Sequence, residues 1–344
     1  MEKTFTGKRI LITGGAGSFG KAMLERLLRE GPKVVRIIDH DEEGLFAIEQ
    51  AFGCDERIRT LVGDIRDKDR LKRAVEGIDI IIHAAALKHV NSCEYNPFEA
   101  VKTNIIGTQN LIDVAIDEEV EKVMLTSTDK AANPTNVMGA SKLMGEKLIV
   151  AANYYTGGRK TVFSCVRFGN VIGSSGSVIP LFSEQIKRGG PVTVTNPDMT
   201  RFVISMEEAV NLVTRSVQIA HGGEVFILKM PAVRVGTLAE AMIEELSEEY
   251  GLRPSDVKIK NIGIKAGEKM HEDLMTEEEL ARSLETDEFF IILPQIKEVS
   301  EINRPNYRNA AAARKLGFSS KDAAMLSKQD TKQMLRSEKR KNAL

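Results

Sequence analysis

The chain has 344 residues and a formal net charge of −1; 42% of its residues are hydrophobic and 28% are charged. This length is too great for one small core and suits two joined domains of a soluble globular protein. The balanced charge gives no sign of a nucleic-acid or acidic-membrane partner, and the three separated cysteines fit free thiols in a reducing compartment better than disulfides or a zinc site.

The first nine residues have no long apolar core, which argues against a signal peptide, and no apolar run is long enough to span a bilayer. We therefore expect a cytoplasmic protein with no membrane or nucleic-acid partner and no metal site.

The first half of the sequence alternates short, β-branched apolar runs with helical patterns. Strands are predicted over 9–13, 34–38, 59–62, 78–82, 122–126 and 161–168, and helices over 21–29, 69–75 and around Lys142. Near-continuous apolar strands joined by helices are typical of a parallel sheet covered on both faces. The predicted fold class is therefore α/β, with a doubly wound parallel sheet.

A glycine-rich turn joins the first predicted strand to the first helix. Glycines at 14, 17 and 20 allow a tight turn, close approach of a pyrophosphate and packing of the helix on the strand. The N–H groups and dipole at the helix N-terminus favour the phosphates. The residues predicted to hold a dinucleotide here are Gly14, Gly17, Ser18, Phe19 and Gly20.

The next three strands also end in residues suited to a dinucleotide. Asp39 can take the adenosine ribose hydroxyls and repel a 2′-phosphate, which favours NAD over the alternative NADP; a simple strand-end turn is the other interpretation. Asp64 and Ile65 are placed to contact the adenine, although Asp64 could equally be a helix N-cap. The small side chains of Ala84 and Ala85 let the cofactor lie against the backbone.

Arg36 and His83 belong to the same strands but are expected to serve the structure. The alternation of side chains along a strand turns Arg36 away from the cofactor, and His83 is expected to pack at a strand end rather than to act as a catalyst.

Thr128, Asp129 and Lys130 follow the fifth strand, where substrate and nicotinamide should meet. A carboxylic acid beside an amine supplies a proton donor and a proton acceptor in one site. The alternative is a surface turn pair. Lys142 lies four residues after Met138, on the same helical face, and is expected to bind the nicotinamide ribose. This spacing resembles the Tyr-x-x-x-Lys pair of short-chain dehydrogenase/reductases, with methionine in place of tyrosine.

The chain as a whole resembles the extended short-chain dehydrogenase/reductases that act as UDP-N-acetylglucosamine 4,6-dehydratases in surface-glycan synthesis. The segments that carry the resemblance are 12–20, 83–90, 102–108, 127–132, 167–171 and 198–202. They imply an extended Rossmann fold with a smaller, mixed substrate-binding domain. The domains expected are a dinucleotide-binding domain over 1–169 plus about 203–227, a substrate-binding domain over about 170–202 plus 228–300, and a packing or oligomerisation segment over 301–344. Several family members share the methionine at the tyrosine position.

The resemblance implies that NAD oxidises sugar C4, that Lys130 removes the C5 proton, that Asp129 protonates the departing C6 hydroxyl, and that Thr128 hydrogen-bonds the C4 oxygen. Asp129 is also the candidate acceptor of the C4 hydroxyl proton. The implied substrate-binding residues of the UDP-sugar are Lys88, Asn170, Arg201, Lys265 and Glu268. Lys265 stands where the family usually has arginine, so diphosphate binding leans on Arg201. The alternative interpretation of Lys88 is a solvated lysine at the start of a helix, with no role in binding.

Family members retain or invert the C5 configuration. Residues 92–97 and the extended C-terminal segment resemble the inverting members, whereas Asp39-His40 resembles the retaining, NAD-using ones. Inversion is slightly favoured. Two alternative functions remain, a UDP-sugar 4-epimerase and a non-catalytic nucleotide-binding regulator. The protein is expected to form a homo-oligomer (dimer or hexamer).

Overall fold

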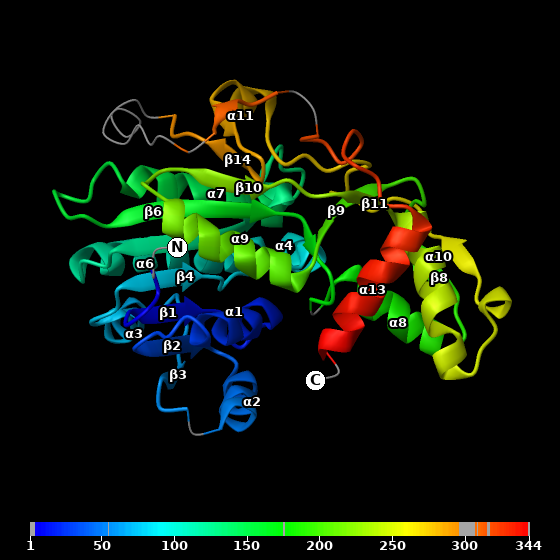
Figure 1. Cartoon of the computed structure of the whole chain (residues 1–344), viewed down its shortest axis with the longest axis horizontal. Coiled ribbons are helices and arrows are strands. Elements are labelled where there is room, and N and C mark those ends of the chain that lie inside the picture. Colours follow the sequence, from blue (N-terminus) through cyan, green and yellow to red (C-terminus); the bar gives the residue numbers. More distant parts are fainter. Residues whose placement is uncertain are drawn as a thin grey trace.

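The computed structural model describes residues 4–53, 55–174, 176–295, 307, 309–314 and 317–342. This part of the chain forms one lobe around a ten-stranded sheet and a second lobe with a three-stranded and a two-stranded sheet (Figure 1). No helix in these ranges is both long and apolar enough to cross a membrane.

The large sheet has the strand order β15-β13-β14-β10-β6-β5-β4-β1-β2-β3. Every neighbouring pair from β3 to β10 is parallel, and the order β3-β2-β1-β4-β5-β6 is that of a dinucleotide-binding, doubly wound fold. The predicted fold class is therefore confirmed. The parallel strands are β1 (Arg9–Thr13), β2 (Val34–Asp39), β3 (Ile58–Val62), β4 (Ile80–His83), β5 (Lys122–Thr128), β6 (Val162–Phe168) and β10 (Val225–Leu228).

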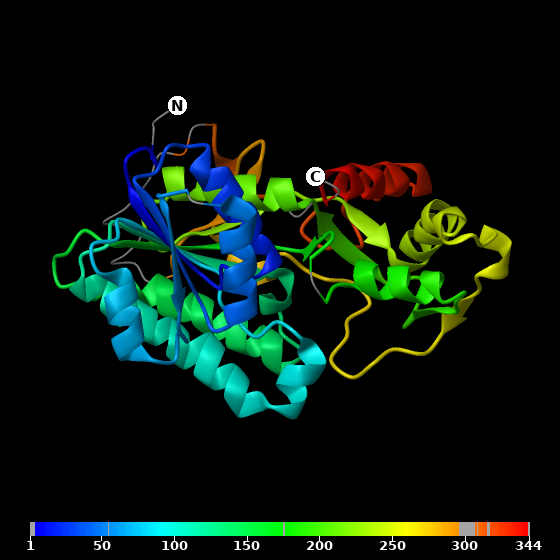
Figure 2. The same ribbon diagram turned by 90° about the horizontal axis from the view of Figure 1, so that it is seen from below.

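Two helical layers cover this sheet because its strands are apolar on both faces (Figure 2). In β4, for example, Ile81 packs into one core while Ile80 and Ile82 pack into the other. The helices and helical turns are α1 (Ser18–Leu28), α2 (Glu42–Phe52), α3 (Lys68–Val75), α4 (Val90–Tyr95), α5 (Pro97–Ala100), η1 (Val101–Ile106), α6 (Gly107–Asp117), η2 (Asp129–Ala131), α7 (Val137–Ala152) and α9 (Met206–Ile219). Helices α3, α6 and α7 cover one face, and α1, α2 and α9 cover the other.

The second lobe has its own apolar core, centred on Phe182, Val192 and Met242. Its elements are β7 (Asn170–Val171), α8 (Val178–Lys187), β8 (Val192–Val194), β9 (Thr200–Ile204), β11 (Ala232–Arg234), α10 (Val235–Leu246), η3 (Glu248–Tyr250), η4 (Pro254–Asp256) and β12 (Ile259–Asn261). Helix α13 (Lys328–Asn342) packs along α10, where its lysines and arginine form ion pairs with four glutamates of 240–249.

Residues 277–292 and 311–312 return to the large sheet. The elements involved are α11 (Glu277–Ala281), β13 (Ser283–Glu285), β14 (Phe289–Ile292) and β15 (Ala311–Ala312), and the three strands pair antiparallel at the β10 edge. The expected boundary assigned all of 228–300 to the substrate-binding domain, but β13 and β14 of that range extend the large sheet. Apolar residues of β14 explain the difference, because Phe290 and Ile292 complete one core while Phe289 and Ile291 complete the other.

Candidate active site

The glycine turn after β1 has no room for side chains. Gly14 has a φ of +69°, and a Cβ there would lie 2.6 Å from the backbone nitrogen of Ala85. A Cβ on Gly20 would lie 2.4 Å from the Cα of Gly15, so this glycine lets α1 approach the strand. Helix α1 begins after Gly17 without a side-chain cap and without an acidic residue in its first turn. Its N-terminal N–H groups and dipole therefore suit the phosphates of a dinucleotide.

Asp39 lies against this glycine turn at the end of β2. One of its carboxylate oxygens accepts a hydrogen bond from the backbone of Ala16 at 3.0 Å and the other from that of Asp41 at 3.1 Å. The exposed ring of His40 lies 3.3 Å from the same carboxylate. Arg36 points away, as expected, and donates to the carbonyls of Ala74 and Glu76. An acidic side chain is thus held beside the turn with no arginine facing it from β2.

Asp64 does not cap a helix. The N-cap of α3 is Asp67, which accepts the backbone N–H of Arg70 at 2.9 Å, so the N-cap alternative for Asp64 is wrong. Asp64 instead pairs with Arg66 at 2.6 Å; partial burial opposes ionisation, but the hydrogen bonds from Arg66 hold the pKa of Asp64 below its usual value. The neighbouring Ile65 side chain is buried in the core, which leaves its backbone for any contact with a cofactor.

His83 is fully buried at the end of β4, between the hydroxyls of Thr13 at 2.7 Å and Thr108 at 3.2 Å. Burial, with a smaller contribution from the charge of Lys142, lowers the pKa of His83 to about 3. The ring is therefore neutral at physiological pH and packs as expected. Ala84 and Ala85 follow it and border the glycine turn.

Asp129 and Lys130 form a buried pair at the carboxyl end of β5. The Asp129 side chain is 0% exposed, and its Oδ1 accepts hydrogen bonds from Lys130 Nζ and Thr128 Oγ1, both at 2.9 Å. Its Oδ2 is buried without a partner among the described residues. Burial opposes the charge on Lys130, but the carboxylates of Asp129 and Glu272 outweigh it and raise the pKa of the amine. The alternative of a surface turn pair is wrong, because such a pair would face solvent.

Lys142 lies on α7 behind this pair. Its amine donates to the carbonyl of Thr126 at 2.7 Å, and burial lowers the pKa of Lys142 to about 8, although Glu146 opposes the shift. Met138, one turn earlier, is buried in a small apolar cluster with Cys93 and Ala100. The methionine at the tyrosine position therefore serves packing between α4 and α7.

The proposed substrate residues lie on the second lobe and on the loop before α4. Asn170 is in β7, and its Oδ1 is buried without a partner among the described residues. Arg201 is in β9 and donates to the carbonyl of Thr200 at 2.8 Å. Lys88 is exposed near the start of α4, a position that leaves its solvated alternative open.

Lys265 and Glu268 are on the loop that returns from the second lobe after β12. The carbonyl of Gly267 accepts hydrogen bonds from Thr135 at 2.9 Å and Asn136 at 3.1 Å, which attaches this loop to the segment after η2. The Glu268 carboxylate turns back toward the backbone of Lys265. Both residues are thereby brought to the same edge of the large sheet as Asp129 and Lys130.

Glu272 is a residue of this site that the sequence did not reveal. It lies on the returning loop, is buried, and places Oε1 4.0 Å from Lys130 Nζ. Burial raises the pKa of Glu272, as does the charge of Asp129, while Lys130 and Arg201 oppose the shift. The two partners are far apart in the sequence, and their meeting depends on how the second lobe returns to the sheet, so no local pattern could have indicated it.

A second buried charge cluster anchors the same loop. Arg167 of β6 is fully buried and binds Glu146 of α7 at 2.6 Å and Glu279 of α11 at 3.0 Å. It also donates to the carbonyl of Leu274 at 2.7 Å. Burial opposes the charge, but the two carboxylates outweigh it and raise the pKa of Arg167. The guanidinium thus joins the sheet, the helix that carries Lys142 and the segment that follows Glu272.

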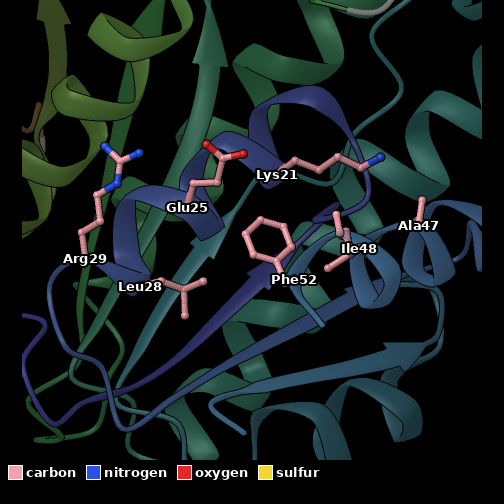
Figure 3. A pocket seen from close by; sticks show the side chains of 8 residues that line it. Lys21, Glu25, Leu28, Arg29, Ala47, Ile48 and Phe52 are labelled. Atoms are coloured by element: carbon pink, nitrogen blue, oxygen red, sulfur yellow. The ribbon is translucent and has the colours of Figure 1, made fainter. Parts of the chain in front are cut away.

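One cavity of about 450 Å³ lies away from these residues (Figure 3). It is a groove between α1 and α2, lined by Lys21, Glu25, Phe52 and their neighbours. It contains none of the predicted site residues, so the site is defined by the side chains at the carboxyl edge of the sheet.

The sequence matches the model of a family described as "Polysaccharide biosynthesis protein" over residues 10–294. The chain is 53% identical over 332 residues to an uncharacterized membrane protein of Methanocaldococcus jannaschii, with 96% of each sequence covered. It is 44% identical over 299 residues to a UDP-N-acetylglucosamine 4,6-dehydratase (inverting) of Campylobacter jejuni, with 86% of each covered.

Other relatives widen the range of activities. The chain is 40% identical over 292 residues to a UDP-glucose 4-epimerase of Rickettsia bellii, with 84% of this chain and 83% of that protein covered. Among solved structures, the X-ray structure of Pen from Bacillus thuringiensis has a TM-score of 0.90 and 44% identity, and the match covers 97% of this chain and 98% of that one.

Proposed function

The chain belongs to the polysaccharide biosynthesis protein family, a family of nucleotide-sugar-modifying short-chain dehydrogenase/reductases, and from this premise we propose that it is a UDP-N-acetylglucosamine 4,6-dehydratase. The single observation that carries the proposal is the buried lysine–carboxylate pair of Lys130 and Asp129 at the carboxyl end of β5. An epimerase needs to act only at C4, whereas loss of water across C5 and C6 needs both a base and an acid.

The residues around the glycine turn fit NAD. The uncapped N-terminus of α1 suits the pyrophosphate, and Gly14 and Gly20 keep the backbone open for it. Asp39 would take the adenosine ribose hydroxyls and disfavour a 2′-phosphate. Lys142 would bind the nicotinamide ribose. When bound, NAD would accept a hydride from sugar C4 and later return this hydride to C6.

The residues after β5 would then move the protons. Thr128 hydrogen-bonds the C4 oxygen as charge develops on it, and Asp129 accepts the C4 hydroxyl proton. The ketone at C4 acidifies the C5 hydrogen, which Lys130 removes. Asp129 gives its proton to the C6 hydroxyl, which leaves as water. Inversion requires a proton from the opposite face of C5, which water would supply, and Lys130 gives the proton that it removed to solvent at the end of the turnover. The C4 hydroxyl proton thus leaves in the water and the proton count closes.

The second lobe would hold the nucleotide. Arg201 and Lys265 provide two cations for the diphosphate, Asn170 provides an amide, and Glu268 accepts hydrogen bonds from the uridine ribose. Lys88 would reach the sugar from the other side. We further propose that the enzyme is a cytoplasmic homo-oligomer and inverts C5, as the name of the Campylobacter jejuni relative says of that protein.

The test is to incubate the purified protein with NAD and UDP-N-acetylglucosamine and to measure the product by mass spectrometry. The proposal predicts a 4-keto-6-deoxy product lighter than the substrate by one water. Variants Asp129→Asn and Lys130→Ala are expected to lose this product. A product of changed C4 configuration and unchanged mass would overturn the proposal in favour of a 4-epimerase, the activity that names the Rickettsia bellii relative.

A non-catalytic regulator is the other candidate, and Met138 is the observation that favours it, because methionine cannot move a proton. NAD binding without turnover on any UDP-sugar would support that function. The Asp129–Lys130 pair argues against it, because the buried Asp129 keeps one oxygen without a partner among the described residues, a cost that a structural anchor such as Arg167 avoids.

A further inference from the structure

Lys130 has carboxylates on two sides. Asp129 Oδ1 lies 2.9 Å from its amine, and Glu272 Oε1 lies 4.0 Å away on the loop from the second lobe. The two carboxylate side chains are 0% and 5% exposed, so bulk water contributes little to their stability. One partly exposed ammonium therefore faces two buried acids.

Neither acid is fully satisfied. Asp129 Oδ2 and Glu272 Oε2 are both buried and accept no hydrogen bond from the described residues. Leaving an ionised oxygen buried without a partner is costly, and protonation is the usual way to relieve that cost. A site with one ammonium and two such carboxylates can move a proton from the ammonium to one of the carboxylates.

The proposed reaction needs such an exchange. A charged amine cannot remove the C5 proton, so Lys130 must first lose a proton, yet its carboxylate neighbours favour the charged form. Asp129 is already required for the C4 and C6 protons. Glu272 is the other described carboxylate beside the amine. Burial raises the pKa of Glu272, so it takes a proton more readily than an exposed glutamate does.

The charges that face Glu272 come from three elements. Lys130 and Asp129 lie on η2, Arg201 lies on β9, and Lys269 precedes Glu272 on its own loop. Among these, Lys130 can hand over a proton and stay within the site, whereas Arg201 stays charged at any working pH.

Glu272 is also held firmly. Its backbone N–H donates to Ser320 Oγ and its carbonyl accepts from the Ser320 N–H, both at 2.8 Å. The Ser320 hydroxyl in turn contacts Thr200 Oγ1 at 2.7 Å, next to Arg201. Two residues further along, Leu274 is bound by the buried Arg167. The backbone that carries the Glu272 carboxylate is therefore fixed from the sheet, from β9 and from the segment before α13.

We propose that Glu272 is a positioning residue that acts through Lys130 by accepting the proton that this lysine must lose before it can act as the base at C5. The proton leaves Lys130 as the Glu272 carboxylate becomes a carboxylic acid, and it returns when Lys130 has given its own proton up at the end of turnover. No charge enters or leaves the site. The gap of 4.0 Å closes with a small side-chain rotation or one bridging water. This inference rests on the proposed dehydratase function.

The experiment compares the pH dependence of kcat in the wild type, Glu272→Gln and Glu272→Asp, with NAD and UDP-N-acetylglucosamine. In Glu272→Gln, Lys130 must lose its proton to solvent. We expect kcat near neutral pH to fall about 10²-fold, with little change in KM. The kcat of this variant should then rise about tenfold per pH unit, so that the difference in kcat between variant and wild type becomes smaller in alkaline solution. Glu272→Asp restores part of kcat. Glu278→Gln, an exposed glutamate on the same segment, is the matched control and keeps wild-type kinetics.

The outcomes separate the two proposals. If the wild type forms no dehydrated product, the proposed function is wrong. If the wild type dehydrates its substrate and Glu272→Gln keeps the wild-type kcat and pH profile, only the role of Glu272 is overturned; a loss of kcat equal at every pH overturns it as well, because that indicates a structural role. If Glu272→Gln does not fold, the Glu272→Asp profile decides: a kcat lowered most at neutral pH supports the role, and an unchanged profile overturns it.

Discussion

Two charge clusters in this molecule have the same ratio of charges but differ in how their carboxylates are held. Each contains one cation between two carboxylates: Arg167 with Glu146 and Glu279, and Lys130 with Asp129 and Glu272. Around Arg167 every carboxylate oxygen accepts a hydrogen bond of 2.6–3.1 Å from the guanidinium. Around Lys130 one contact is 2.9 Å, the other is 4.0 Å, and two oxygens have no partner among the described residues.

The difference follows from the two cations. A guanidinium has five donors in a planar fork and stays charged, so it can satisfy two carboxylates at once and fix them. An ammonium is a compact charge, and it gives up its proton when its surroundings favour the neutral amine. The same ratio of charges therefore forms an anchor at Arg167 and, under our proposal, a proton-exchange site at Lys130, and residues 272–279 connect the two clusters.

The largest effect is expected at Lys130. Replacing it with methionine removes the base at C5 but keeps an unbranched side chain, and kcat for dehydration should fall by about 10³- to 10⁴-fold. The product is measured by mass spectrometry, and the fold by circular dichroism. Lys147→Met, on an exposed turn of α7, is the control and should keep its activity. Appreciable turnover by the Lys130 variant would show that the cluster around Lys130 is not the reactive one.

Arg167 should matter for stability instead. In Arg167→Met, Glu146 and Glu279 are left buried without their cation, and the free energy of unfolding should fall by about 3–5 kcal/mol in urea titrations. Replacing Glu146 and Glu279 by glutamine in the same variant should recover part of the loss, because no uncompensated charge then stays buried. A variant as stable as the wild type would contradict the role of Arg167 as an anchor.

The pH dependence of stability distinguishes two lysines of the site. Burial lowers the pKa of Lys142 to about 8, whereas its value in the unfolded chain is near 10.5. Between these pH values the unfolded chain binds more protons, so the contribution of Lys142 to the free energy of unfolding rises with pH, by on the order of 2 kcal/mol. Lys130 shifts in the other direction and should lose its contribution only at higher pH.

The measurement is unfolding by urea at several values of pH between about 7 and 10, a range that brackets the pKa of Lys142. In Lys142→Met this rise in the free energy of unfolding should disappear. The free energy of unfolding of the wild type relative to the variant should therefore increase with pH. A constant difference would mean that the amine of Lys142 is not desolvated.

The smallest effect concerns Asp39, a buried carboxylate that accepts hydrogen bonds from two backbone N–H groups. Its negative charge should repel the 2′-phosphate of NADP and weaken binding relative to NAD by about tenfold, on the order of 1.4 kcal/mol. Calorimetric titration with both cofactors tests this. Glu43→Gln, an exposed acid on α2, should leave the ratio unchanged, and Asp39→Asn should reduce it. Equal affinities in the wild type would contradict the role of Asp39.

The sequence predicts the first half of the molecule well because its signals are local. Strands such as 9–13 and 34–38 are apolar runs, and β1 and β2 follow them closely. The glycine turn and the Asp129–Lys130 pair are contiguous, so their residues could be identified before their surroundings were known. The strand predicted over 122–126 continues to Thr128, which carries the polar residues to the edge of the sheet.

What the sequence does not predict depends on contacts between remote segments. Glu272 meets Lys130 only because the chain leaves the large sheet after β10 and returns to it before β13. The partners of Arg167 come from α7 and α11 in the same way. Asp64 shows a local failure of another kind: Asp64 and Asp67 are both plausible caps, and the competing side chain of Arg66 decides between them.

The contact between Glu272 and Ser320 has a consequence for how the protein matures on the ribosome. Residues 318–320 emerge after the glycine turn, the Asp129–Lys130 pair and Glu272 itself have been made. A nascent chain that ends shortly after Glu272 lacks the serine that holds the backbone of this glutamate. The backbone of Glu272 therefore acquires these two hydrogen bonds only after residues 318–320 have been synthesised.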